Sequence, residues 1–459
     1  MFKEYRSRRA DQKSNVLPLE LPVAVPAAAK AQHEEIDEEL QAHLELKNRL
    51  HGELLDRMNL SLVDKVERSE LKRQIASLVS GLVEAEGVYM GTDSFADLVD
   101  DLIHEFMGLG PLEPLLEDPT INDILVNSFD QVYVERFGLL ERSKVRFRDE
   151  RHLLRIIDKI VTQVGRRIDE SQPWVDARLE DGSRVNAIIR PCSVDGPALS
   201  IRKFARNPLT IERLVEQGSL DDQAAKLIEA LVEARLNILI SGGTGTGKTT
   251  MLNAVSSFID PDQRIVTIED AAELQLQQEH VVRLETRPPN SEGTGSITQR
   301  DLVRNALRMR PDRIIVGEVR GTECFDMLQA MNTGHEGSMT TIHANTARDA
   351  LGRVEQMVTM LGTDLPVKTI RSQIASAIHI VVQLARLSDG SRRVISVSEV
   401  TGMEEETITM QDIFIYKRRG KSETGQILGE FLPTGIRPKC FDQLIASGID
   451  IDNQMFSRQ

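Results

Sequence analysis

The chain has 459 residues, too many for one hydrophobic core, and a formal net charge of −15, which disfavours a broad nucleic-acid-binding surface. Its three cysteines, Cys192, Cys324 and Cys440, are far apart, which argues against a paired-cysteine zinc site and fits a reducing cytosol. No apolar run approaches a membrane span and no signal peptide is recognisable, so we expect a cytosolic protein that meets a membrane only from its cytosolic side.

The first 90 residues are predicted to form a tail followed by helices. Residues 1–33 are expected to be a disordered tail, because three prolines interrupt every regular pattern. Residues 34–90 are expected to form a small helical bundle, because apolar residues recur there near helical spacing: Leu40, Leu44, Leu50 and Leu54, then Leu71, Ile75, Leu78 and Leu82. This bundle could bind a partner or a membrane surface, or it could pack its apolar stripe on itself or a neighbour.

Residues 91–218 are predicted to form a separate, smaller α+β domain. The pattern favours helices at 96–107 and 152–164, and strands at 123–126, 132–136, 143–148, 183–189 and 198–203. No motif for chemistry lies in this region. It does carry arginines near its strand ends: Arg178, Arg184, Arg190 and Arg202.

The strongest signal in the chain is a phosphate-binding loop between a strand and a helix. Leu236–Ile240 is an apolar run typical of a buried strand, and a helix is expected from Lys248 to about Ile259. The pattern G-x-x-x-x-G-K-T between them lets backbone N–H groups surround anionic oxygens, while the lysine reaches the β- and γ-phosphates and the Thr249 hydroxyl ligates Mg²⁺. The residues predicted to hold the nucleotide are Gly242, Gly243, Thr244, Gly245, Thr246, Gly247, Lys248, Thr249 and Thr250.

Residues 219–459 are predicted to form the nucleotide-binding domain, because strands and helices alternate along them. Further strands are expected at 264–268, 281–285, 313–316, 338–342 and 378–384, with helices near 220–235, 299–309, 322–331, 346–360 and 368–377. Such alternation is typical of a mainly parallel sheet with both faces covered. Two strands with alternating polarity, at 394–400 and 407–416, predict an antiparallel appendage.

Three strand ends carry residues suited to nucleotide hydrolysis, which needs an acid near Mg²⁺, a group that orients water and positive charge at the leaving phosphate. The acidic stretch Glu269–Glu273 follows the first strand, and its carboxylates could hold the attacking water. Glu318 ends the second strand and is expected to act on Mg²⁺ through the metal's water shell. His335 and His343 flank the third strand, where His343 could sense the γ-phosphate. Acids and histidines in such places are often merely structural, and the phosphate loop is what favours function here.

These segments, in this order after a phosphate loop, resemble the secretion ATPase superfamily of type II and type IV secretion and type IV pili. Within it, four stretches are similar to the tight-adherence (Tad/Flp, type IVc) pilus assembly ATPases: LGPLEPLLEDPTINDILVN (109–127), ALSIRKF (198–204), ISGGTGTGKTTMLNA (240–254) and TGHEGSMTTIHANT (333–346). The resemblance covers about residues 95–400. It implies an α/β fold: a RecA-like motor domain with a mainly parallel sheet, preceded by a smaller α+β, PAS-like domain.

The resemblance also implies roles for individual residues. Glu273 matches the glutamate that polarises water, Glu318 matches the second acidic box, and His343 matches the box histidine. Arginines from the N-terminal domain complete the site in this family, and the matching positions are Arg184 and Arg202, with Arg190 as a further candidate.

At the level of the assembly, the resemblance implies a homo-hexamer that binds ATP and Mg²⁺ between its two domains. Hydrolysis would move the domains as rigid bodies and drive an inner-membrane platform protein that adds pilin subunits. The protein would then lie in the cytoplasm, peripherally at the inner membrane. The four-cysteine zinc box of some relatives is missing, so no zinc is expected.

Five alternatives stay open. The motor could withdraw pili, or both extend and withdraw them, or drive type II secretion. A nucleic-acid translocase would need a basic stripe and stacking aromatics, of which a chain with four tyrosines and this charge offers little. A non-catalytic scaffold would bind nucleotide without turning it over.

Overall fold

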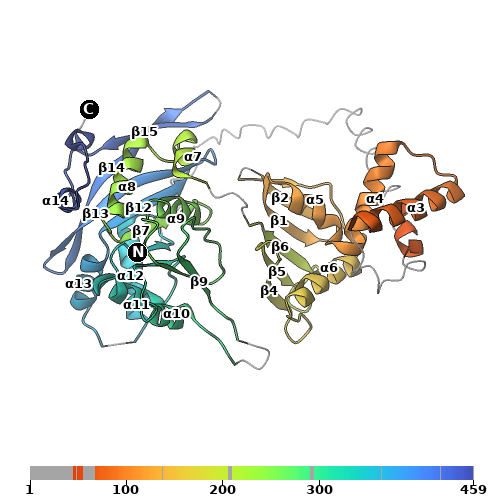
Figure 1. Cartoon of the computed structure of the whole chain (residues 1–459), viewed down its shortest axis with the longest axis horizontal. Helices are drawn as coiled ribbons and strands as arrows, with labels where there is room; N and C mark the ends of the chain where they lie inside the picture. The colour runs from red at the N-terminus through yellow and green to blue at the C-terminus, as the bar shows by residue number, and fades with distance from the viewer. Residues whose placement is uncertain are drawn as a thin grey trace, which may run out of the picture.

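The computed structural model describes residues 45–47, 49–54, 68–136, 138–204, 209–289, 294–362, 364–423 and 425–457. Within these ranges, the strands form one sheet of six and one of nine (Figure 1). The predicted tail lies outside the described residues, as do Leu40 and Leu44. The predicted boundaries at 33/34, 90/91 and 218/219 stay predictions.

Two helices of the N-terminal region bury one apolar stripe each. They are α3 (Arg68–Glu86) and α4 (Thr92–Met107). Leu71, Ile75 and Leu82 of α3 are buried as their spacing predicts, whereas Leu78 is partly exposed. They share a core with Leu98 and Leu102 of α4. The apolar periodicity is therefore used for packing within this part of the chain.

The six-stranded sheet is antiparallel throughout and has the order β3-β2-β1-β6-β5-β4. Helix α6 packs its apolar side into the same core as β1 and β2. The elements of this part are η1 (Gly110–Leu112), α5 (Glu113–Glu117), β1 (Ile121–Ser128), β2 (Gln131–Arg136), β3 (Leu139–Arg142), α6 (Glu150–Gln163), β4 (Trp174–Arg178), β5 (Arg184–Ile188) and β6 (Ala198–Arg202).

Two features of this sheet differ from the sequence expectation. The strand predicted at 143–148 is wrong: the edge strand β3 precedes it, and residues 143–148 have no regular structure. Leu139 and Leu140 of β3 are both exposed, so no alternation marks this strand in the sequence. The other edge strand, β4, was not predicted, and it begins with the half-exposed Trp174.

The nine-stranded sheet has the order β15-β14-β13-β12-β7-β11-β10-β8-β9. Its strands from β12 to β9 run parallel, and β13, β14 and β15 extend it antiparallel. The strands are β7 (Ile238–Gly242), β8 (Ile265–Glu269), β9 (Val281–Glu285), β10 (Arg313–Val316), β11 (Met339–Ile342), β12 (Ile380–Arg386), β13 (Arg392–Glu404), β14 (Thr407–Lys421) and β15 (Ile427–Pro433). The predicted antiparallel appendage is thus confirmed, and β15 adds to it.

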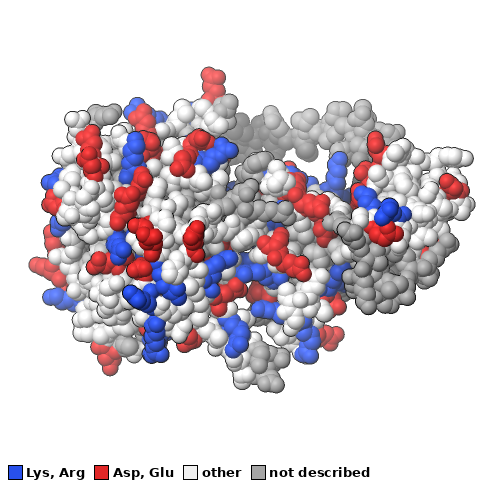
Figure 2. Space-filling model, in the orientation of Figure 1, with Lys and Arg blue, Asp and Glu red and all other residues white. Residues whose placement is uncertain are grey.

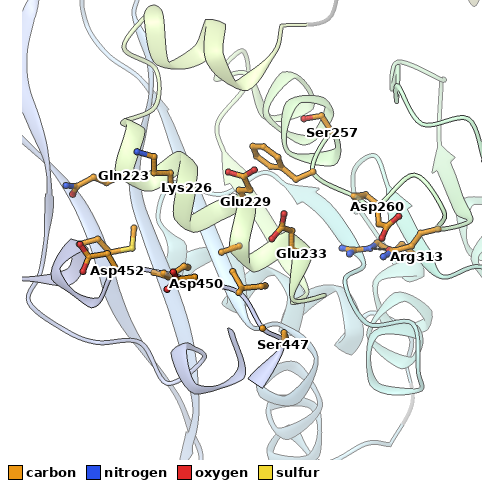
Figure 3. Close-up of a pocket in the computed structure, with 18 of the residues that line it drawn as sticks. Gln223, Lys226, Glu229, Glu233, Ser257, Asp260, Arg313, Ser447, Asp450 and Asp452 are labelled. Atoms are coloured by element: carbon orange, nitrogen blue, oxygen red, sulfur yellow. Dashed lines mark hydrogen bonds between the residues drawn. The ribbon is translucent and has the colours of Figure 1, made fainter. Parts of the chain in front are cut away.

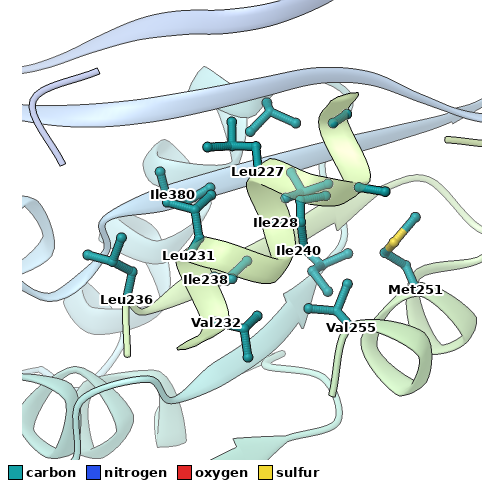
Figure 4. Packing of buried hydrophobic residues seen from close by; sticks show 14 of the residues in the cluster. Leu227, Ile228, Leu231, Val232, Leu236, Ile238, Ile240, Met251, Val255 and Ile380 are labelled. Atoms are coloured by element: carbon teal, nitrogen blue, oxygen red, sulfur yellow. The ribbon is translucent and has the colours of Figure 1, made fainter. Parts of the chain in front are cut away.

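Helices cover both faces of this sheet, so its central strands are apolar on both sides. Ile238 and Ile240 of β7 belong to one core and Leu239 to the other. Helix α8 lays Leu227 and Leu231 against the first face (Figure 4). The helices are α7 (Ile211–Glu216), α8 (Asp222–Glu233), α9 (Lys248–Ser256), α10 (Gln299–Ala306), α11 (Glu323–Asn332), α12 (Ala347–Thr359), α13 (Val367–Ala377), α14 (Phe441–Ala446) and η2 (Asn453–Phe456). The predicted fold class is confirmed: a mainly parallel α/β sheet follows a smaller α+β part and N-terminal helices.

A buried glutamate ties the C-terminal segment to the antiparallel extension. Glu399 of β13 is 3% exposed. Its carboxylate accepts hydrogen bonds from the backbone N–H groups of Lys439 and Cys440, at 2.9 and 2.7 Å, and from the Gln411 amide at 2.8 Å. The start of α14 is therefore held by a charge that backbone dipoles stabilise.

Candidate nucleotide-hydrolysis site

The loop from Gly242 to Gly247 joins the central strand β7 to helix α9. A side chain at Gly242 would place its Cβ 2.5 Å from the Thr246 hydroxyl, and Gly245 and Gly247 have φ values of 69° and 93°. These conformations favour glycine, so the pattern of the motif is a requirement of the backbone. The Thr246 hydroxyl donates to the Gly243 carbonyl at 2.9 Å, which closes the loop on itself.

Lys248 begins helix α9 and points back along the loop. Its Nζ lies 3.1 Å from the Gly243 carbonyl oxygen and 3.2 Å from Nε2 of His343. Burial lowers the pKa of this ammonium, although Glu318 acts to raise it. The predicted phosphate-binding charge is thus held in place. Of the other predicted loop residues, Thr244 is exposed and Thr249 and Thr250 are partly exposed.

Two of the three strand-end predictions meet at Lys248. Glu318 follows β10 and His343 follows the neighbouring β11, and 2.9 Å separate Oε1 of the glutamate from Nε2 of the histidine. Burial and then Lys248 lower the pKa of His343. The other oxygen of Glu318 accepts a hydrogen bond from Arg320 at 2.7 Å, which raises the pKa of the guanidinium. Lys248, Glu318, His343 and Arg320 therefore form one cluster at the carboxyl ends of parallel strands.

The remaining strand-end prediction, the acidic stretch Glu269–Glu273, contains one buried carboxylate with a structural role and one accessible carboxylate. Glu269 ends β8 and is 4% exposed, and burial raises its pKa. Its Oε2 accepts hydrogen bonds from the backbone N–H groups of Glu273 and Leu274, at 2.7 and 2.9 Å. Glu269 therefore shapes the turn that presents the partly exposed Glu273 side chain. His335, the other predicted histidine, lies before β11 and is partly exposed. Its backbone carbonyl accepts a hydrogen bond from the Ser338 hydroxyl.

The arginines of the six-stranded sheet differ in what they contact. Arg184 reaches the nine-stranded sheet, where its Nε lies 3.1 Å from Oε1 of Glu273 and its Nη2 donates to the Ala271 carbonyl at 2.6 Å. Arg202 is paired with Arg184 in adjacent strands, but it donates to Asp123 at 3.0 Å within its own sheet. Glu273 still contributes to its raised pKa, after the hydrogen bond to Asp123.

Arg190 is not brought to the phosphate loop, because its Nε faces Glu150 of α6 at 3.4 Å. Arg178, in contrast, joins the sheets, with Nη1 donating to Glu285 at 2.8 Å. Of the predicted arginines, Arg184 thus contacts the acidic turn and Arg202 lies beside it on the neighbouring strand, while Arg190 contacts its own part of the chain.

Two arginines beside the phosphate loop were missed in the sequence. Arg386 ends β12 and Arg392 begins β13, and a Cβ on Gly247 would lie 3.7 Å from Cδ of Arg392. Both also contact the six-stranded part: Arg386 donates to the Gly138 carbonyl, and Arg392 Nη2 lies 3.8 Å from Oε1 of Glu135. The only signal in the sequence is the turn rich in charge that separates these two strands.

The residues present fit Mg²⁺ better than a softer metal. The candidate donors are the Thr249 hydroxyl and the Glu318 carboxylate, and hard cations prefer such oxygen atoms. The Glu318 side chain is 18% exposed, so water can reach it. Among the described residues, no group of three or more His, Cys, Asp and Glu side chains is placed to hold a metal ion. None of the described helices has the length and apolar character needed to cross a bilayer.

A phosphate loop on the central strand of a mainly parallel sheet, with an acidic strand end beside its lysine, defines a P-loop nucleotide hydrolase. Comparison with known families agrees, since the model of the family described as "Type II/IV secretion system protein" matches residues 105–428. The chain belongs to this family, and within it the chain is an ATPase.

Relatives named for secretion and conjugation are similar over much of their length. A Mycobacterium tuberculosis protein, named provisionally for conjugal transfer, is 40% identical over 335 residues, 72% of this chain and 94% of its own. The type IV secretion system protein VirB11 of Brucella suis is 32% identical over 317 residues, 63% of this chain and 88% of its own. The conjugal transfer protein TrbB of Rhizobium radiobacter is 33% identical over 290 residues, covering 62% and 86%.

Two solved structures are also similar. The Brucella suis VirB11 ATPase in complex with sulphate is 30% identical with a TM-score of 0.34, covering 63% of this chain and 95% of that one. The pilus retraction motor PilT with bound ADP is 22% identical with a TM-score of 0.46, covering 63% and 81%. The family assignment depends on the sequence matches, because both TM-scores are below 0.5.

Proposed function

We propose that this chain is a Mg²⁺-dependent ATP-driven motor that powers assembly of a Tad/Flp-type pilus. It would act as a ring of six at the cytosolic face of the inner membrane, on a platform protein that adds pilin subunits. The family assignment supports a secretion or pilus motor. The four stretches similar to Tad/Flp assembly ATPases support the narrower assignment.

The observation that carries the motor function is the ion pair between Arg184 and Glu273. It joins a sheet without catalytic motifs to the acidic turn beside the phosphate loop. A bound γ-phosphate would compete with Glu273 for the guanidinium, because both are anions. Each sheet has its own core, so the two parts would move as rigid bodies when that competition changes.

The roles of the site residues follow from their chemistry. Lys248 and the loop N–H groups would hold the phosphates, and Mg²⁺ held near Thr249 and Glu318 would neutralise part of their charge. Glu273 would accept the proton of the attacking water, once Arg184 turns to the phosphate. His343 contacts both Lys248 and Glu318. A change at the γ-phosphate that moves Lys248 would therefore also move His343, which follows β11, and Glu318, which follows β10.

ATP turnover by the purified full-length chain tests this function. We expect Lys248→Ala to abolish nucleotide binding and Glu318→Gln to retain binding while turnover stops. Isothermal calorimetry measures the first quantity and phosphate release the second. Turnover that survives in both variants would overturn the assigned site. Binding by the unaltered protein without any turnover would favour the scaffold alternative instead.

A second function is favoured by the relatives: a motor for type IV secretion or conjugal transfer. Replacing the native gene by a Lys248→Ala allele separates the two. Loss of surface pili in electron micrographs, with DNA transfer and protein secretion intact, supports the pilus motor. Intact pili with lost transfer or secretion contradicts it. Pili that persist but no longer shorten would identify a retraction motor.

A further inference from the structure

A large cleft lies on the side of the nine-stranded sheet away from the phosphate loop. Its volume is about 1480 Å³. Its walls are helix α8, the turn at 257–263 and the C-terminal segment 447–457, with Arg313 at one end (Figure 3). Helix α8 precedes β7, the turn precedes β8, and Arg313 begins β10. The cleft therefore lies at the amino ends of the parallel strands, whereas the nucleotide site lies at their carboxyl ends.

The accessible charge in this cleft is negative. Five acidic side chains line it, against two basic ones: Glu229, Glu233, Asp260, Asp450 and Asp452, against Lys226 and Arg313. Both basic groups are already engaged. Lys226 donates to Asp222 at 2.7 Å. Arg313 is 1% exposed, and its guanidinium donates to Gln263 and to the Val232 and Gly337 carbonyls.

Asp222 of α8 is paired with Lys226, but the other two acids of this helix, Glu229 and Glu233, are not paired in this way. No ion pair joins Glu229 or Glu233 to a basic side chain within the described part of the chain. Burial and the neighbouring Glu233 raise the pKa of Glu229, although Lys226 acts to lower it. A cation brought to this helix face would therefore relieve repulsion between two carboxylates one turn apart.

Apolar side chains lie beside these acids. Phe258, Ile449, Ile451 and Met455 line the cleft and are only partly buried against the core. An occupant that covers them must be apolar on one face, and one that meets the acids must be cationic on another. An amphipathic peptide rich in Lys or Arg has both properties.

We propose that this cleft binds a basic amphipathic segment of a partner protein. Helix α9 connects it to the catalytic loop: the helix begins at Lys248 and ends at Ser256, and the next residues form the cleft wall. A partner seated there contacts the far end of the helix that presents Lys248 to the phosphates. Binding of the segment to the cleft does not depend on the proposed pilus function. Only an effect of the bound segment on ATP turnover, through α9, rests on the ATPase activity.

The test uses the full-length chain and a fluorescein-labelled 18-residue peptide of Leu and Lys in helical amphipathic order. We expect binding by fluorescence anisotropy, and a loss of about tenfold in affinity for the double variant Glu229→Gln/Glu233→Gln. The matched control Glu84→Gln/Asp97→Asn removes the same charge from exposed positions of α3 and α4. It should bind as the unaltered protein does. A peptide with Glu in place of Lys should not bind.

Hydrogen exchange locates the peptide. Protection of 222–233, 257–263 and 447–457 supports the proposal, and protection elsewhere overturns it. An equal loss of affinity in both double variants would show attraction to the overall charge, which also overturns it. Sedimentation of the Glu229→Gln/Glu233→Gln variant gives the last outcome. A changed oligomeric state would show that the cleft is an interface between copies of this chain, which would overturn a partner protein as its occupant.

Discussion

Arg184 reaches from one sheet to the other, where its Nε lies 3.1 Å from Oε1 of Glu273. The same guanidinium also donates to the Ala271 carbonyl, so it is fixed at two points of the acidic turn. The carboxylate that is expected to accept a proton is thus engaged before substrate arrives. Under the proposed mechanism, this ion pair would have to open before catalysis.

Glu273→Gln tests the proton acceptor. The amide keeps the size of the side chain but cannot take up a proton, so we expect kcat to fall by about a hundredfold or more. The dissociation constant for ATP should not rise, since Glu273 makes no phosphate contact and only competes with the γ-phosphate for Arg184. Phosphate-release kinetics and calorimetry measure the two quantities. Unchanged kcat would remove Glu273 from the mechanism.

Arg184→Ala tests the transferred positive charge. A catalytic arginine contributes about a thousandfold to phosphoryl transfer, and we expect a loss of that order in kcat. Arg190→Ala is the matched control, because that arginine faces Glu150 within its own part of the chain. Equal losses in both variants would point to general damage to the N-terminal part rather than to catalysis.

Arg392→Ala tests the arginine beside the phosphate loop. Its side chain passes 3.7 Å from the position of a Cβ on Gly247, so it can reach a bound phosphate. One lost charge-assisted hydrogen bond corresponds to about a tenfold rise in KM for ATP. Its neighbour Arg393 instead donates to the Gly218 carbonyl. The folded fraction of the Arg393→Ala variant should therefore have an unaltered KM for ATP.

Gly317→Ala tests the packing between the two acidic strand ends. An added Cβ would lie 2.9 Å from Cγ of Glu269, and so would displace the carboxylate that holds the turn carrying Glu273. We expect a loss of about 1–3 kcal/mol in unfolding free energy and a lower kcat with little change in ATP binding. Denaturant titration and steady-state kinetics measure these effects.

Gly352→Ala supplies the control for that substitution. Gly352 lies inside α12 with nothing within 4 Å of its Cβ position, so alanine should stabilise the protein by about 0.5–1 kcal/mol. Destabilisation at Gly352 equal to that at Gly317 would contradict the packing argument.

Part of the pH dependence of stability follows from partly buried histidines. Nδ1 of His379 accepts the Asn237 N–H at 2.9 Å, so the ring must be neutral there, and burial lowers its pKa. The folded state then binds fewer protons than the unfolded state, whose histidine pKa is about 6.5. The unfolding free energy should therefore fall as pH decreases from about 7.5 through the lowered pKa of this ring.

His379→Asn isolates this contribution, because its amide oxygen can still accept the Asn237 N–H. Its unfolding free energy, measured by denaturant titration at several pH values, should vary less steeply over the same range. Some dependence should persist, since the pKa values of His51 and His343 are also lowered. An unchanged slope would show that His379 does not titrate as described.

The sequence predicted best what is local in the chain. The strand, loop and helix around Lys248 follow from a short apolar run, fixed glycines and one lysine, and the structure confirms all three. Glu318 and His343 were also predicted at two of three strand ends, because parallel strands bring their carboxyl ends to one edge. The strands β10 and β11 that carry them are indeed neighbours.

What was missed depends on contacts between distant segments. Nothing near Arg392 indicates that Gly247 and Glu135 will lie beside it, since more than a hundred residues separate them. The edge strand β3 lacks alternation because all of its residues are exposed, and in β4 the exposed–buried–exposed pattern covers only Trp174, Val175 and Asp176. Arg202 was matched to the site by its motif alone, and its partner Asp123 lies on a strand that no local pattern connects with it.

The anchoring of Lys439 and Cys440 by Glu399 bears on how this protein should be prepared. A gene cut just before Lys439 would remove the two backbone N–H groups that donate to the interior carboxylate of Glu399, and would uncover Phe414 by removing Phe456. Such shortened products should precipitate. Affinity tags should therefore be added after the C-terminal segment rather than replace it.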